Sequence, residues 1–377
     1  MTLEEAKQAF EELKAQGETD ETILAVLYEM YKDDTIGLDE LESLIGVLGY
    51  EFTEEFKKMS PKDKKTKGYE LTQNNTIGGK KMKTNEIKDF NNNSKYDKTA
   101  QNASYGNYNE EVKAFGKNYR PLNHYVMDHT LYLCQNDPEL INSIEDSKNN
   151  QYVVYHEETL NVNEDGPTTN IIVSNKRSFE AAKAYKGKKV AVLNFANNHK
   201  PGGSPWSAGA QEESLCRTST LFPCLEAISP KYHVLHASKY HNGELDNLGN
   251  DDLIYTPGIV VIKTDESAPL LLDQSERFNV DIITAAAPEV KFGIDNNTLY
   301  NVLASRIEKI LQSAKNENVD VLILGAFGCG AFGNPPELVA KIFKEKLEKY
   351  SFDTVEFAVY CSTDSPNNNY HIFKQIV

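Results

Sequence analysis

The chain has 377 residues, of which 40% are hydrophobic and 25% charged, and its formal net charge is −16. This composition suits a globular protein of about two domains, and the acidic balance excludes a protein that holds nucleic acid in a basic groove. No stretch approaches the ~20 apolar residues of a membrane span, and the N-terminus is acidic rather than basic and then apolar, so we expect a cytoplasmic protein with no membrane partner.

The first 59 residues predict a small all-α accessory module. Apolar residues recur at helical spacing over residues 20–31 and 38–48, and a shorter pattern covers residues 53–58. Residues 60–111 are rich in lysine, asparagine and glycine and carry few large aliphatic side chains, so they predict a flexible, low-complexity linker. We expect the helical module to dock on a protein partner whose identity the sequence does not reveal.

Residues 112–377 predict an α/β domain with a largely parallel central sheet. Apolar strands that alternate with amphipathic helices form such sheets, covered on both faces, and ligands bind beyond the carboxyl ends of their strands. Strand patterns lie at residues 152–155, 169–173, 189–195, 259–263, 280–285, 321–324 and 355–360, and helix patterns at residues 178–185, 212–224, 299–312 and 337–350.

A first candidate site segment, residues 194–217, reads NFANNHKPGGSPWSAGAQEESLCR. Gly202 and Gly203 allow a backbone to approach a ligand closely, because they have no Cβ. Glu212 and Glu213 are paired carboxylates of the kind that cleave glycosidic bonds. The alternative is a glycine-rich turn before an acidic helix start, because acidic residues favour the first helical turn in any case.

A second candidate segment begins with an apolar strand pattern at residues 320–327 and continues as GCGAFGNPP before the next helix pattern. A strand, a glycine loop and a helix start together bind phosphates, because unpaired amides and the helix dipole both face the anion. Cys329 lies between two of the glycines, but no base for a nucleophilic cysteine is identifiable. A glycine loop alone is a weak signal.

Together with DLIYTPG at residues 252–258 and DIITAAAP at residues 281–288, the two segments resemble the poly(ADP-ribose) glycohydrolase family, in particular its short microbial branch. The resemblance covers residues 154–377 and implies a three-layer macrodomain. It implies ADP-ribose or poly(ADP-ribose) on modified macromolecules as the partner, and no metal or cofactor. The implied ADP-ribose contacts are Asn197, Gly202, Gly203, Gln211, Gly328, Cys329, Gly330, Ala331, Phe332 and Gly333.

The resemblance also implies distinct roles for the two glutamates. Hydrolysis of a ribosyl bond passes through an oxocarbenium-like state, so it needs a proton donor to the leaving oxygen and help for the incoming water. Neighbouring helical residues point about 100° apart and cannot lie symmetrically across one bond. By resemblance, Glu213 is the catalytic acid/base, Glu212 holds the ribose hydroxyls and Gln211 shapes the turn.

The first segment departs from the family pattern in two places. Family members usually have three glycines where this chain reads PGGS at residues 201–204, and Lys200 stands where microbial relatives tend to have asparagine. Two alignments fit: Ser204 takes the third glycine position, or Pro201 takes the first and both close-approach glycines are kept. Because Lys200 replaces the asparagine, Asn197 is the expected ribose contact.

Two aromatic residues have two interpretations each. Phe332 resembles an aromatic residue that packs on the ribose, and it also fits a core phenylalanine after a glycine turn. Trp206, in the first segment, fits either a lid over the ligand or an anchor for its loop.

The predicted function is hydrolysis of O-glycosidic bonds of poly(ADP-ribose) with release of ADP-ribose. One alternative is a non-hydrolytic ADP-ribose reader, which the altered glycine triplet keeps open. Another is a hydrolase that removes single ADP-ribose units from protein or nucleic acid, and it differs only in the leaving group. The intact pair of Glu212 and Glu213 favours an enzyme.

Overall fold

The computed structural model divides into two compact units, residues 1–102 and residues 103–377, which are described separately. It describes residues 107–377 except 117, 169, 247, 291–292, 363–364 and 366–367, and, before residue 107, residues 27, 31, 38, 41–42, 45, 50–52, 54–58, 64, 70–73 and 81–83.

The first unit contains strands as well as helix. β1 (Tyr50–Phe52), β2 (Glu70–Gln73) and β3 (Lys81–Lys83) form an antiparallel sheet in the order β1-β2-β3, and the short helix α4 (Glu54–Lys57) follows β1. The predicted all-α module is therefore corrected at residues 50–52, and the range predicted as linker contains β2 and β3. Backbone pairing explains the difference, because β1 needs β2 as its partner and residues 50–52 alone do not reveal it. The remaining helix predictions fall largely outside the described residues.

The second unit is built on a seven-stranded sheet in the order β4-β7-β8-β6-β9-β10-β5. β8, β6, β9, β10 and β5 run parallel, whereas β7 is antiparallel to both of its neighbours. This confirms the predicted, largely parallel sheet. The strands are β4 (Tyr152–Val154), β5 (Ile171–Ser174), β6 (Val190–Phe195), β7 (Leu253–Val261), β8 (Phe278–Ala285), β9 (Val321–Leu324) and β10 (Thr354–Ala358).

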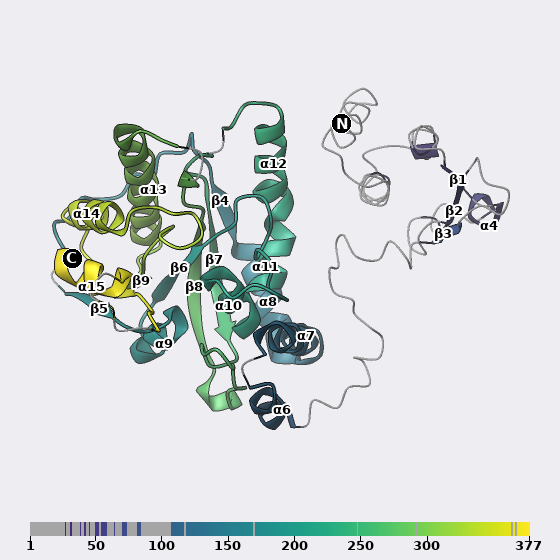
Figure 1. Ribbon diagram of the computed structural model, residues 1–377, viewed down its shortest axis with the longest axis horizontal. Helices are drawn as coiled ribbons and strands as arrows, with labels where there is room; N and C mark the ends of the chain where they lie inside the picture. The colour runs from purple at the N-terminus through teal and green to yellow at the C-terminus, as the bar shows by residue number, and fades with distance from the viewer. Residues whose placement is uncertain are drawn as a thin grey trace. The chain divides into compact units, whose positions relative to one another are not determined.

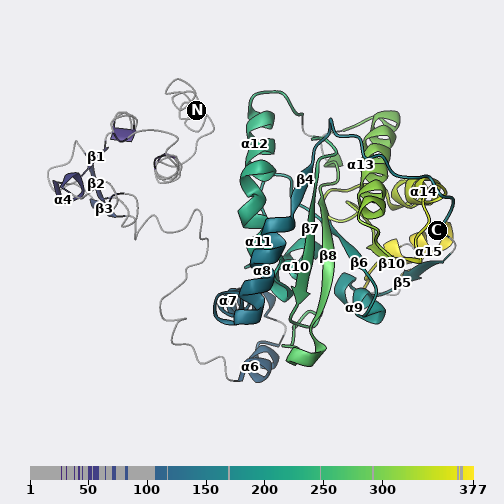
Figure 2. The same cartoon turned by 180° about the vertical axis from the view of Figure 1, so that it is seen from behind.

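Helices cover both faces of this sheet, which gives the three layers expected of a macrodomain (Figures 1 and 2). On one side lie α13 (Asn296–Asn316), α14 (Pro336–Leu347) and α15 (Asn369–Ile376). On the other lie α7 (Tyr119–Asn136), α8 (Pro138–Asn150), α10 (Gln211–Thr218), α11 (Leu221–Ile228) and α12 (His233–His241). The short α9 (Ser178–Ala182) packs on β6, β9 and β10.

Strand β6 shows why the sheet is buried on both sides. Ala191 and Leu193 belong to the core cluster shared with α13 and α14, and Val190 and Val192 are also buried. Because successive side chains of a strand point to opposite faces, a strand between two helical layers is apolar at nearly every position. Asn194 is the buried polar exception in β6.

The predicted helix at residues 212–224 is two helices, α10 and α11. The chain extends between them: Ser219 forms an antiparallel bridge with Val261, and the Thr220 amide donates to the Val260 carbonyl at 3.0 Å. This segment satisfies backbone groups of β7 beyond the end of the short strand β4. The helix stops because the sheet edge needs a partner there.

The second unit begins earlier than the predicted boundary at residue 112. Helix α6 spans Tyr108–Ala114, and the buried Tyr108 donates to the Pro269 carbonyl at 2.9 Å. Its ring also stacks on His129 of α7, with the centroids 4.0 Å apart. Within the part of the chain that the structure describes, no helix has the length and the apolar character of a membrane span.

Candidate active site

A cavity of about 460 Å³ lies where the parallel strands end. Segments that follow β5, β6, β8, β9 and β10 all contribute to its wall, as expected for an open α/β sheet. Of the predicted site residues, the wall contains Asn197, Gln211, Glu212, Glu213, Gly328, Gly330, Ala331 and Phe332, whereas Gly202, Gly203, Cys329 and Gly333 lie outside it.

The loop between β6 and α10 holds each of the two glutamates with a backbone amide. The amide of Asn197 donates to Glu212 Oε2 at 2.8 Å, and the amide of Ser204 donates to Glu213 Oε1 at 3.1 Å. Asn194, the buried polar residue of β6, donates to Glu212 Oε1 at 3.3 Å. The neighbouring carboxylates are therefore fixed in different orientations, as their helical positions require.

Gly202 and Gly203 are needed for the shape of this loop rather than as part of the cavity wall. Their φ angles are +69° and +63°, which side chains rarely adopt. A Cβ on Gly202 would lie 2.8 Å from the Phe222 ring, and one on Gly203 would overlap the Glu213 carboxylate. Ser204 is not among the residues with positive φ, so the position after Gly203 accepts a side chain without backbone strain.

Gln211 connects the start of α10 to the end of β6. Its Oε1 accepts from the Phe195 amide at 2.9 Å, while its Nε2 donates to the Leu193 carbonyl at 2.7 Å and to Ser178 Oγ at 3.1 Å. All of these hydrogen bonds are formed within the protein. This geometry fits the predicted role of Gln211 in shaping the turn.

Trp206 anchors the same loop. Its Nε1 donates to Asp128 of α7 at 2.8 Å, and its ring packs edge-on against Phe222. It is not part of the cavity wall. Of the two interpretations from the sequence, the structure therefore favours the anchor over the lid.

The two glutamates differ in their electrostatic environment. Burial raises the pKa of the Glu212 carboxyl to about 8, although the hydrogen bonds from Asn197 and Asn194 act in the opposite direction. Both oxygens of Glu212 accept hydrogen bonds. Glu213 uses only Oε1, and its Oε2 has no hydrogen-bond partner among the described residues. Glu213 therefore has an oxygen available to a ligand in the cavity.

The second loop, after β9, is held by Asn334. The Asn334 side chain donates to the Pro288 carbonyl at 2.9 Å and to the Gly328 carbonyl at 3.1 Å. A Cβ on Gly328, where φ is +71°, would overlap both Asn334 and Ala287. Gly328 is thus required by the packing of the loop.

The other residues of this loop differ in backbone conformation and in exposure. Gly333 has a φ of +73°, whereas Gly330 does not have a positive φ, and a Cβ on either would meet open space. Gly330 and Ala331 are exposed, and Phe332 is half-buried against the core. Burial raises the pKa of Cys329 to about 12, so this thiol is not the thiolate that nucleophilic catalysis requires.

Asn197 contributes mainly through its backbone. Its amide binds Glu212, and its side-chain Oδ1 accepts from the amides of His199 and Lys200, both at 2.9 Å. The side chain therefore forms a local turn. The expected contact between Asn197 and the ribose stays a prediction.

Several residues of the cavity wall were not predicted from the sequence. Arg177 follows β5 and lies over the Tyr360 ring, with 4.3 Å between the guanidinium carbon and the ring centroid. Asp265 accepts from the Phe179 amide at 2.8 Å and from Ser214 Oγ at 3.1 Å, and burial raises its pKa. These residues carry no motif. Their only signal is position: Arg177 lies four residues after the predicted strand at residues 169–173, and Tyr360 is the last residue of the predicted strand at residues 355–360.

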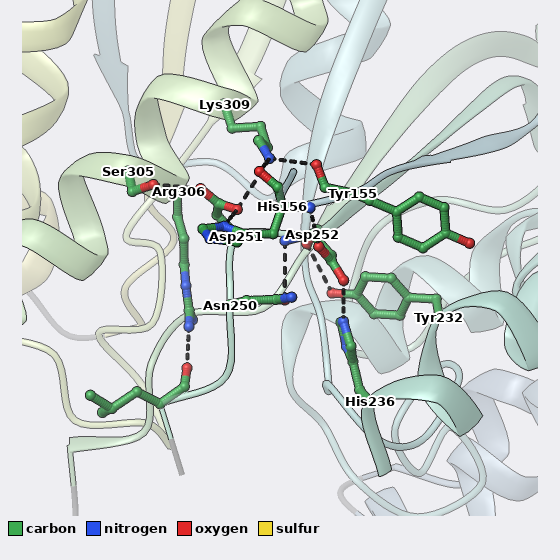
Figure 3. Close-up of polar contacts among 11 residues, drawn as sticks. Tyr155, His156, Tyr232, His236, Asn250, Asp251, Asp252, Ser305, Arg306 and Lys309 are labelled. Atoms are coloured by element: carbon green, nitrogen blue, oxygen red, sulfur yellow. Dashed lines mark hydrogen bonds and ion pairs between the residues drawn. The ribbon is translucent and has the colours of Figure 1, made fainter. Parts of the chain in front are cut away.

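A polar network joins α13 to the segment before β7 (Figure 3). Asp251 forms an ion pair of 3.1 Å with Lys309 of α13, and both side chains are buried. Arg306 lies one turn earlier on the same helix, and its Nη1 donates to the Ala286 carbonyl at 2.6 Å. Because Ala287 is part of the cavity wall, Arg306 fixes the exit of β8 against the ligand site.

Comparison with known proteins supports the resemblance seen in the motifs. Residues 124–264 match the family model described as "Microbial-type PARG, catalytic domain", where PARG stands for poly(ADP-ribose) glycohydrolase. A comparison with curated proteins finds no match.

Solved structures of poly(ADP-ribose) glycohydrolases are similar over most of this chain. The enzyme from Thermomonospora curvata, bound to the inhibitor ADP-HPD, is 29% identical, with a TM-score of 0.59 over 67% of this chain and 98% of that one. The enzyme from Deinococcus radiodurans in complex with ADP-ribose is 26% identical, with a TM-score of 0.51 over 62% of this chain and 95% of that one. The predicted macrodomain-type fold and the resemblance to microbial poly(ADP-ribose) glycohydrolases are confirmed.

Proposed function

We propose that this protein hydrolyses poly(ADP-ribose) to ADP-ribose, the activity of the family that it matches, and that Glu213 is the general acid/base. The observation that carries the role of Glu213 is its hydrogen bonding. Its Oε1 is held by the Ser204 amide, and its Oε2 has no protein partner among the described residues while the residue lines the cavity. A group that transfers a proton needs such an oxygen within reach of the substrate.

In the proposed reaction, the terminal ADP-ribose unit occupies the cavity and its anomeric carbon lies beside Glu213. Glu213 protonates the leaving ribose oxygen as the glycosidic bond breaks, and the resulting carboxylate then takes a proton from the incoming water. Glu212, held by Asn197 and Asn194, orients the hydroxyls of the reacting ribose. This division follows from the different orientations of the two carboxylates.

The loop at residues 328–333 is the proposed site for the diphosphate. It follows a parallel strand and precedes α14, and no backbone acceptor among the described residues pairs with the amides of Gly330, Ala331 and Phe332. These amides are the proposed donors to the anion. Contacts from neutral amides agree with the acidic composition of the chain, because they need no cluster of basic side chains.

A serine at position 204, instead of a third glycine, is no argument for a protein that binds ADP-ribose without hydrolysis. The contact that the loop makes with Glu213 uses the backbone amide of Ser204, and any residue except proline supplies that donor. The serine therefore leaves the catalytic carboxylate held as a glycine would.

The direct test is incubation of the purified protein with automodified poly(ADP-ribose) polymerase, followed by chromatography of the released nucleotides. We expect free ADP-ribose to accumulate. Calorimetric binding of ADP-ribose without any release from the polymer would support the reader instead. Release only from singly modified protein or nucleic acid would identify a mono-ADP-ribosyl hydrolase.

We also propose a cytoplasmic location and a protein partner for residues 1–59. The support is the composition of the chain. Cell fractionation tests the location, and crosslinking of the full chain, compared with a chain that lacks residues 1–59, tests the partner.

A further inference from the structure

We propose that Lys200 and Ser204 form an anion subsite on the leaving-group side of Glu213, where they bind the diphosphate of the next unit of the polymer. The inference rests on the proposed function, and it adds a binding site outside the ADP-ribose cavity. It would make the enzyme prefer a polymer over a substrate with an uncharged leaving group.

The geometry places a cation close to the catalytic carboxylate. Lys200 Nζ lies 3.4 Å from Ser204 Oγ, and the amide of the same serine binds Glu213 Oε1 at 3.1 Å. The Lys200 ammonium is therefore two polar contacts away from the proposed acid. Neither Lys200 nor Ser204 belongs to the wall of the cavity, so the pair lies outside the proposed ADP-ribose site.

The backbone of Lys200 is fixed, so its side chain extends from a defined point. Its amide donates to Asn197 Oδ1 at 2.9 Å, and its carbonyl accepts from the Gly203 amide at 3.1 Å. The turn from Lys200 to Gly203 also depends on the positive φ of both glycines. A phosphate that binds at this loop would therefore contact an ammonium group whose backbone position is already fixed.

The charge of Lys200 has no counterpart in the described part of the chain. Its side chain is exposed, and its polar partner is the Ser204 hydroxyl. The two cations of the cavity wall differ: Lys176 pairs with Glu356 at 3.6 Å, and Arg177 lies over Tyr360. An ammonium group without a carboxylate partner loses less free energy than a paired one when it breaks its existing contacts to bind a phosphate.

The chemical structure of the polymer places an anion on the leaving-group side of Glu213. The bond that breaks joins the ribose in the cavity to an oxygen of the next ribose, whose 5′ carbon carries a diphosphate. That diphosphate lies within one sugar of Glu213 on the leaving side. Lys200 supplies charge, and the Ser204 hydroxyl can donate a hydrogen bond to a second phosphate oxygen.

The test compares two substrates in six proteins: wild type, Lys200→Met, Lys200→Arg, Ser204→Ala, the double variant of Lys200→Met and Ser204→Ala, and the matched control Lys186→Met. Lys186 is also an exposed lysine with a single oxygen partner, the Ser275 carbonyl at 3.1 Å, but it lies before β6, at the opposite end of that strand from the site. One substrate is the polymer, and the other is ADP-ribose with a neutral nitrophenyl leaving group. Calorimetry gives the Kd of monomeric ADP-ribose for each protein.

We expect Lys200→Met to lower kcat/KM on the polymer about fivefold at low salt and to keep the nitrophenyl turnover and the Kd of ADP-ribose. Lys200→Arg should retain the polymer preference, and added salt should reduce it in the wild type. Ser204→Ala should give a smaller loss that is not additive with Lys200→Met, because the two side chains are in contact.

Two results would overturn the subsite. In one, Lys200→Met cleaves the polymer as fast as Lys186→Met. In the other, Lys200→Met loses as much affinity for monomeric ADP-ribose as it loses on the polymer, which would assign Lys200 to the cavity. A wild type that leaves the polymer intact refutes the proposed function itself, and the subsite with it.

Discussion

Arg217 lies one helical turn after Glu213 on α10, and it binds the loop that holds the Glu213 carboxylate. Its Nη1 donates to the carbonyls of Pro205 and Ala208 at 2.8 and 2.6 Å, and Ser204, adjacent to this stretch, donates its amide to Glu213. Arg217 is buried. A single helix therefore carries the proposed acid and, four residues later, the brace for the loop that orients it.

We predict that Arg217→Lys lowers kcat by at least about tenfold, because a compact ammonium cannot reproduce the rigid guanidinium fork and small displacements at a reacting centre are costly. The Kd of ADP-ribose should change little. Steady-state kinetics and calorimetry check both halves. If the variant loses stability but keeps kcat at permissive temperature, Arg217 supports the fold and does not position the loop.

Glu213→Gln should abolish turnover while ADP-ribose still binds. An amide cannot donate a proton to the leaving oxygen, and loss of a general acid/base typically costs ~10²- to 10⁴-fold in rate. The Ser204 amide can still donate to the amide oxygen of glutamine, so the loop should keep its shape. Release of ADP-ribose from the polymer measures the rate, and wild-type turnover in this variant would refute the assignment.

The raised pKa of Glu212 predicts a pH-dependent stability. The folded protein keeps the Glu212 proton up to about pH 8, whereas an ordinary glutamate loses it near pH 4.5. Between these values the folded state binds more protons than the unfolded state, so this group makes the free energy of unfolding fall as pH rises. Above about pH 8 the contribution is constant.

Glu212→Gln should flatten this dependence, because the amide does not titrate. Urea unfolding at pH 5 and pH 8 gives the change for each protein, and we expect it to be smaller in the variant by at least about 1 kcal/mol, since each unit of pKa separation corresponds to about 1.4 kcal/mol. Equal changes in the two proteins would show that Glu212 titrates normally in the folded state.

Substitutions at two glycines of the second loop should affect different properties: one should weaken ADP-ribose binding, and the other should lower stability. Gly330→Val places a side chain in open space beside the cavity without backbone strain, so it should weaken ADP-ribose binding about tenfold or more and leave the melting temperature unchanged. Gly328→Ala should instead lower the melting temperature, because its Cβ would overlap Asn334 and Ala287 at a positive φ.

Calorimetry and melting curves on both variants test this contrast. Binding of monomeric ADP-ribose by the wild type should also depend only mildly on salt, because neutral amides make the proposed phosphate contacts. Wild-type affinity in Gly330→Val, with an unchanged melting curve, would show that the loop is only a structural turn.

A fragment that starts at residue 103 should be more stable than one that starts at residue 112. The shorter fragment lacks Tyr108, whose hydroxyl binds the Pro269 carbonyl and whose ring packs on His129. Loss of a buried aromatic side chain typically costs about 3–5 kcal/mol. Thermal melting of both fragments measures the difference, and equal melting temperatures would place the domain boundary at residue 112.

The sequence by itself determined the elements whose signal is local. The apolar run at residues 321–324 is β9, and the glycines that the motifs single out at positions 202, 203 and 328 have positive φ. These features were predictable because an apolar run between breakers, or a residue without Cβ, constrains the chain wherever the rest of it goes. The resemblance in the motifs was specific enough to predict the fold and the family model that matches residues 124–264.

Only the tertiary structure decided what depends on partners distant in sequence. Arg177 and Tyr360 meet at the cavity because β5 and β10 end near it, and Asp265 joins them through its hydrogen bonds with Phe179 and Ser214. Helix α10 stops where Ser219 pairs with Val261. The distinction between Glu212 and Glu213 has the same origin. Two adjacent glutamates are chemically identical in the sequence. They become different because strand β6 and the loop after it each give Glu212 a hydrogen-bond donor, whereas one oxygen of Glu213 stays open to the cavity.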